Sequence, residues 1–142
     1  MKAFALAMLF GISLTACATD GHRIMEDDEL EAAGWAAMEV GAFGQAIGLL
    51  LHRAQAGDSE AEFTIGFLAL LWLEAETPSE APRYSLEDAL TWIRKAAAKN
   101  LPQAAGFLRS GYEWGRYTMS KSAKLEECWR RGENGEHDAS VC

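Results

Sequence analysis

Apolar residues recur every three or four positions along most of the chain after residue 28, and glycine, proline and short polar segments interrupt the pattern. Such spacing is typical of amphipathic helices, whose buried stripe repeats about every 3.6 residues. It predicts six helices, at residues 29–40, 43–56, about 59–74, about 86–99, 102–115 and about 122–131.

Short polar side chains mark the expected helix starts, because their oxygens can accept hydrogen bonds from the first free N–H groups. Gly41 is expected to end the first helix, and Pro102 suits the first turn of the fifth. The expected caps are Asp28 with Glu31, Asp58 or Ser59, Ser85 with Asp88, and Ser120 or Ser122.

The pattern also predicts which side chains face inward. From Cys17 onward the chain has 21 alanines and 13 leucines against two valines and four isoleucines, which favours an all-α fold. The expected inward residues are Leu30, Ala33, Ala37 and Val40 in the first helix, and Ala46, Ile47, Leu50, Leu51 and Ala54 in the second.

The first 16 residues are expected to lie outside this fold. They carry one cation, Lys2, followed by an apolar run too short for a comfortable membrane span, which indicates a secretion signal. Leu14-Thr15-Ala16-Cys17 resembles the lipobox of bacterial lipoproteins, and this resemblance implies a lipid-modified Cys17 at the start of a tether over residues 17–27. Ala18 then favours the outer membrane, facing the periplasm. The alternative is an ordinary signal peptide with Cys17 unmodified.

Export would place Cys128 and Cys142 in an oxidising compartment. Two interpretations stay open. The two cysteines form a disulfide, whose loop of about 15 residues would add roughly 3 kcal/mol to stability, or Cys128 is a buried helix residue and Cys142 a frayed terminal thiol.

A short signature recurs at residues 57–61, 100–104 and 135–139. Each copy has Gly or Asn at a helix end and Ala four positions later, where the next helix must pack closely. The copies divide residues 28–142 into repeats at about 28–57, 58–100 and 101–135. The last copy predicts an incipient seventh helix at the end of the chain.

These residues resemble the Sel1-like repeat, a relative of the tetratricopeptide repeat. The match is Ala61-x3-Ile65-Gly66 in one helix and Ala89-x2-Trp92-x2-Lys95-Ala96-Ala97 in the next, and Trp35-x2-Met38 before Gly41 resembles the shorter tetratricopeptide type. The resemblance implies an α-solenoid of about three antiparallel helix hairpins in a right-handed superhelical stack. Gly66 would permit close helix approach, and Trp92, Tyr112 and Trp129 would fill spaces between hairpins.

The resemblance also implies a surface that binds a protein partner. On the helical phase of the repeat, Phe67 and Leu70 approach the concave side, where they are either partner contacts or core. The candidate contact residues are Glu60, Phe67, Leu70, Gln103, Ser110 and Glu113.

Charge divides the chain. Residues 1–80 hold 13 acids and three bases, and the rest holds eight acids and ten bases. The acidic half, including Glu60, Glu62 and Glu74, would steer a basic partner toward the first two hairpins. The alternative is that the negative surface serves solubility alone.

The sequence offers little for catalysis. It lacks a Gly-x-Ser-x-Gly elbow, a phosphate-binding glycine loop and a zinc-binding helix motif. His22, His52 and His137 do not have metal-ligand spacing, and the acidic run at residues 26–31 is expected to be a solvated helix start rather than a cation site. We expect no catalytic residue, cofactor, metal, nucleic acid or small-molecule substrate, and no membrane contact beyond the lipid anchor.

The expected function is therefore protein binding at the bacterial envelope. The sharper hypothesis is an immunity protein that inhibits a toxic secreted effector. The alternatives are an envelope scaffold or adaptor in assembly or signalling and, as the weakest, a cell-wall enzyme.

Overall fold

The computed structural model describes residues 27–75, 81–136, 138 and 141–142. The predicted signal segment, Cys17 and its tether lie outside the described residues. The described part is all-helical and contains no strand, which confirms the all-α prediction. Its helices are α1 (Asp27–Glu39), α2 (Phe43–Gln55), α3 (Ser59–Glu74), α4 (Leu86–Ala98), α5 (Pro102–Trp114) and α6 (Ala123–Glu133).

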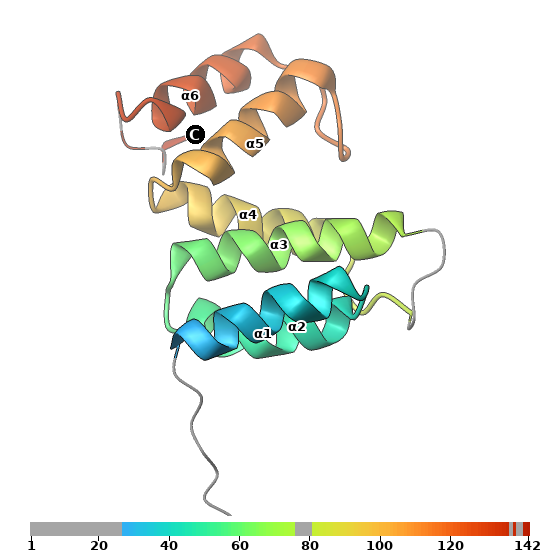
Figure 1. Cartoon of the computed structure of the whole chain (residues 1–142). Coiled ribbons are helices and arrows are strands. Elements are labelled where there is room, and N and C mark those ends of the chain that lie inside the picture. Colours follow the sequence, from blue (N-terminus) through green and yellow to red (C-terminus); the bar gives the residue numbers. More distant parts are fainter. Residues whose placement is uncertain (1–26, 76–80, 137, 139–140) are drawn as a thin grey trace, which may run out of the picture.

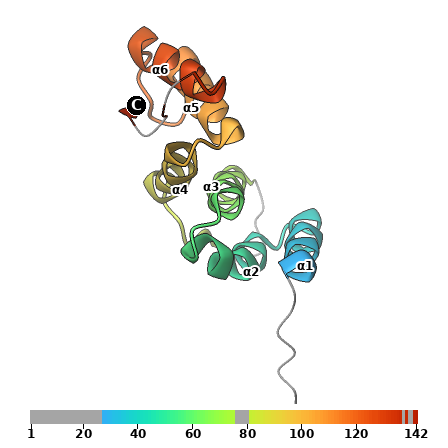
Figure 2. The same cartoon turned by 90° about the vertical axis from the view of Figure 1, so that its left-hand side faces the viewer.

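The helices stack in sequence order, from α1 and α2 at one end to α5 and α6 at the other (Figure 1). Each packs chiefly against its neighbours in sequence. In the turned view, α1 lies to the right of α2, and α3 lies to the right of α4 (Figure 2). One face of the molecule is therefore built partly by α1 and α3.

The predicted helix starts are confirmed at three places. Asp58 accepts hydrogen bonds from the N–H groups of Glu60 and Ala61 at the start of α3. Ser85 and Asp88 form a reciprocal capping box on α4. Ser122, not Ser120, caps α6 by accepting from the N–H of Leu125. These caps satisfy donors that have no partner within the helix.

The first helix differs from the prediction at both ends. It begins at Asp27, so Asp28 lies in its first turn rather than at the cap. It ends at Glu39, because the N–H groups of Gly41 and Ala42 turn back to bind the carbonyls of Met38 and Ala37, with Gly41 at a φ of 74°. Val40 therefore leaves the helix and is 79% exposed, so its predicted inward position is wrong.

The core follows the predicted stripe of α2, with Ala46, Ile47, Leu50 and Ala54 buried and Leu51 packed partly against them. Among the aromatics predicted to fill spaces between helices, Trp129 is buried, while Trp92 and Tyr112 are half-buried against the core. Gly66 on α3 marks a close helix contact, because a β-carbon there would lie 2.7 Å from the Ala89 carbonyl oxygen of α4.

A disulfide joins the end of the chain to α6. After α6, Gly135 adopts a φ of 69°, and Cys142 forms a disulfide with Cys128, with a Cα–Cα distance of 5.7 Å. The disulfide is thus confirmed, and the interpretation as two free thiols is wrong. Most of the predicted seventh helix, including residues 137, 139 and 140, lies outside the described residues.

Asp58 provides a pH-dependent contribution to stability. Burial of its carboxylate raises its pKa, but hydrogen bonds from the Ala61 N–H and the Arg53 side chain outweigh this and hold the pKa below its ordinary value of 3.8. A carboxyl group with a lowered folded-state pKa stabilises the fold above its unfolded-state pKa, and this stability is lost as the pH falls through the folded-state pKa.

We therefore expect Asp58→Asn, which keeps a capping oxygen but loses the charge, to cost about 1 kcal/mol at pH 7. The difference from the wild type should shrink toward zero below the folded-state pKa of Asp58. Urea unfolding of both proteins between pH 7 and pH 2 measures it. A difference that stays constant over this range would contradict the assignment.

Candidate functional site

A hollow of about 270 Å³ lies where α1, α2, α3 and the start of α5 meet. Trp35 and Met38 of α1 line one side of it, and Phe63 of α3 lines another. Leu101 and Gln103, at the start of α5, complete the lining. We call this hollow, together with the adjoining Phe67 ring, the groove. Its volume is slightly below the range of small-molecule sites and suits one large side chain of a partner.

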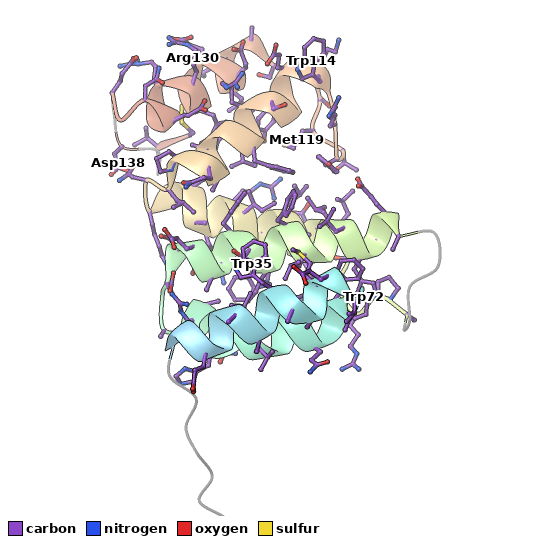
Figure 3. The ribbon with its side chains drawn as sticks, viewed as in Figure 1. Trp35, Trp72, Trp114, Met119, Arg130 and Asp138 are labelled. Carbon is purple, nitrogen blue, oxygen red and sulfur yellow. A yellow bond between two sulfur atoms is a disulfide. The ribbon has the colours of Figure 1, made fainter. Side chains whose placement is uncertain are left out.

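The groove exposes aromatic surface. Trp35 is 49% exposed and lies between α1 and α3 on the face turned toward the viewer in Figure 3. Phe67 is 40% exposed, and its ring stacks on that of Phe63 with 6.1 Å between the ring centroids. Exposed aromatic side chains beside a hollow are typical of binding surfaces, because they offer large apolar area at little cost in side-chain entropy.

The charge of the groove is negative. Arg53 lines it, but the Arg53 guanidinium donates to the Asp58 carboxylate at 2.9 Å from Nε and 2.5 Å from Nη2. Glu60 also lines it, is exposed, and makes no ion pair with any other residue that the structure describes. Glu39, one turn after Trp35 on α1, is likewise exposed and has no ion pair within the described part of the chain. The charges left for a partner are therefore carboxylates.

The structure brings together only some of the predicted contact residues. Glu60 and Gln103 both line the groove, and Phe67 lies beside it on α3. Leu70 is 2% exposed and belongs to the core, so of its two interpretations the core one holds. Ser110 and Glu113 lie on α5 away from the groove lining.

Glu113 is already engaged within the fold. Its carboxylate pairs with Arg109 at 3.0 Å, and Arg109 also binds Glu133 of α6 at 2.9 Å. Ser110 is half-buried beside this network on α5. These contacts hold α5 against α6.

Trp35 and Met38 were not among the predicted contact residues. The predicted inward stripe of the first helix leaves Trp35 on the opposite, polar side of that helix. The signal in the sequence for a binding surface here was a tryptophan off the inward stripe, followed three positions later by a methionine.

Two other residues of the acidic half, Glu62 and Glu74, have contacts within the fold. Glu62 is only 4% exposed and pairs with Lys99 at 2.8 Å, while Lys99 also donates to the Gly57 carbonyl at 2.9 Å. The Glu62 carboxylate is therefore engaged within the fold. The Glu74 carboxylate lies near the Tyr117 hydroxyl, and burial, together with this negative charge, raises the pKa of Tyr117.

A second, shallower hollow surrounds the Glu62–Lys99 pair on α2, α3 and α4. Lys95 lies over the Trp92 ring, with Nζ 4.4 Å from the ring centroid. Both lysines of this hollow are thus engaged with neighbouring side chains, and the Lys99 contacts join the turn after α2 to the end of α4. We assign this region a structural role.

The described residues include no cluster of three or more His, Cys, Asp or Glu side chains suited to a metal ion. His52 is exposed on α2, whereas His22 and His137 lie outside the described residues. In the part of the chain that the structure covers, no helix combines the length and apolar character needed to span a membrane. Comparison of the chain with family models, curated proteins and solved structures found no match.

Proposed function

We propose that this chain is a protein-binding module whose groove holds an apolar side chain of a partner while a neighbouring basic residue of the partner pairs with Glu60 or Glu39. The single observation that carries the proposal is the combination, at one hollow, of exposed aromatic rings with the Glu60 carboxylate, which has no ion pair to any residue described. Buried apolar anchors supply most of the affinity at such sites, and the surrounding charges set partner choice and association rate.

The proposal includes a repeat architecture and an envelope location. Stacking of each helix chiefly on its sequence neighbours, and the close α3–α4 approach at Gly66, support Sel1-like repeats in a right-handed solenoid of three hairpins. The lipobox-like Leu14-Thr15-Ala16-Cys17 supports a lipid anchor, and Ala18 supports the outer membrane. The Cys128–Cys142 disulfide agrees with an oxidising compartment.

Within this class, we propose an immunity role, in which the protein blocks a toxic secreted effector. The negative groove suits a basic surface on the effector. The role requires that an effector encoded beside the gene kills cells that lack this protein, and survival of those cells would overturn it.

Reversing one charge tests the groove directly. We expect Glu60→Lys to weaken partner capture about tenfold, because it replaces an attraction with a repulsion at the rim. The measurement is quantitative crosslinked capture of envelope proteins by the full chain, followed by titration with the partner that is recovered.

Glu87→Lys is the matched control. It makes the same charge change on α4, at an exposed residue outside the groove that forms a surface ion pair with Arg94. It should leave capture within about twofold, since exposed ion pairs contribute little. Equal loss in both variants, or in neither, would overturn the assignment of the groove.

A further inference from the structure

The connection between α5 and α6 presents a basic, aromatic projection. Trp114, the last residue of α5, is 58% exposed, which is the largest exposed fraction of any aromatic side chain that the structure describes. Arg116 and Lys121 follow it, both exposed and without an ion pair to any residue described. We call residues 114–121 the tip.

The tip is held in one shape. Met119 is 4% exposed, and its side chain fills the space beside Gly111. The Tyr117 ring stacks on Phe107 with 5.3 Å between the ring centroids. The N–H of Arg116 binds the Gly111 carbonyl at 3.0 Å, which returns the chain toward α5. A preformed tip loses little conformational entropy when it binds.

Lys121 lies beside the C-terminal end of α5, where Trp114 is the last helical residue. Its Cγ is 3.2 Å from the position that a β-carbon would occupy on Gly115, the residue after Trp114. Gly115 adopts a left-handed φ of 66°, which ends α5 and lets the lysine stem cross over it. One indole ring and two cations are thus grouped at the end of the helix.

The tip and the groove are complementary. The groove offers a hollow for one large apolar side chain, with Glu60 in its lining and Glu39 one turn after Trp35, both without an ion pair in the described part of the chain. The tip offers an exposed indole close in sequence to Arg116 and Lys121. Figure 3 shows Trp35 near the α1 end of the stack and Trp114 near the opposite end. The two surfaces therefore cannot meet within one chain, but they can meet between two copies.

We propose that the tip of one copy docks into the groove of a second copy, so that the protein associates head to tail. This contact uses different surfaces on the two copies and leaves a free groove at one end and a free tip at the other, so it can extend to further copies. The inference rests on the proposed function of the groove as a binding site. It adds a regulatory consequence, because a docked tip competes with the foreign partner.

The test uses two full-length copies with different tags, expressed together in the cell envelope. One copy carries a photo-crosslinking amino acid at position 114, and the crosslinked peptides are identified by mass spectrometry. We expect crosslinks between position 114 of one copy and peptides of α1 and α3 of the other. Absence of a crosslinked dimer, or crosslinks that map to α6 or to the tip of the other copy, would overturn the proposal.

Charge reversal separates docking from chance contact. Glu39→Lys with Glu60→Lys on the groove copy, or Arg116→Glu with Lys121→Glu on the tip copy, should each lower the crosslink yield about tenfold. Combining the reversed groove with the reversed tip should restore most of the yield. Failure of the combination to recover would overturn the pairing, and far-UV circular dichroism of each variant checks that it is folded.

The same variants distinguish this inference from the proposed function. The variant with Arg116→Glu and Lys121→Glu keeps an intact groove. It should therefore capture the foreign partner at least as well as the wild type. Capture of the foreign partner, without crosslinks between copies whose groove and tip charges are unchanged, would overturn the inference and retain the proposed function. Self-crosslinking with partner capture unaffected by Glu60→Lys would retain the inference and overturn the proposed foreign-partner site.

Discussion

Replacing Gly66 with alanine is expected to destabilise the protein by about 2 kcal/mol. A β-carbon at this position would lie 2.6 Å from Cγ1 of Ile93 and 2.7 Å from the Ala89 carbonyl oxygen. The second contact is with backbone, so α3 and α4 must separate to accommodate the methyl group. Overpacking of this kind costs about 3 kcal/mol, and the better helix propensity of alanine returns about 1 kcal/mol.

Gly48→Ala is the matched control. Gly48 is exposed on α2, and a β-carbon there would meet nothing within 4 Å. The same chemical change should therefore stabilise the protein by roughly 0.5–1 kcal/mol. Urea unfolding followed by circular dichroism measures both variants. If Gly66→Ala proved neutral or stabilising, the close approach of α3 and α4 would be wrong.

Breaking the Cys128–Cys142 disulfide is expected to cost about 3 kcal/mol. The bond joins residues 14 positions apart, and its stabilisation comes largely from the freedom that the closed loop removes from the unfolded chain. The bond also matters locally, because α6 has few buried residues, among which are Trp129 and Gly132. We therefore expect Cys142→Ser to lower the stability of α6 most strongly.

Unfolding with and without reductant measures the loss, and hydrogen exchange locates it. Amides of α6 should lose protection by more than those of α3. Reductant added to Cys142→Ser is the control, and it should cause no further loss. A fully reduced wild type as stable as the oxidised protein would contradict the expected contribution of the bond.

The sequence predicted the helices because apolar periodicity and capping residues act over short distances. The six helices, the Asp58 cap and the Ser85–Asp88 capping box follow from neighbouring residues and are confirmed. The error at Val40 lies at a helix end. Val40 faces outward because two hydrogen bonds close α1 one residue earlier.

The candidate site could be predicted only in part. Glu60 and Gln103 were among the predicted contact residues and do line the hollow. The roles of Trp35 and Glu62 depend on contacts between helices that are far apart in sequence. Glu62 and Lys99 are 37 residues apart, and no local pattern shows that their side chains meet. Local spacing assigns residues to helices, whereas a groove between helices is a property of the packed fold.

Packing between sequence neighbours also shapes how the chain can fold. Most contacts in such a stack are local in sequence, and chains with low contact order fold quickly, typically within microseconds to milliseconds. The disulfide lies entirely within α6 and the chain end, so none of the packing among α1, α2, α3 and α4 waits for thiol oxidation. The groove-forming end can therefore order first, while slower oxidation secures the last helix.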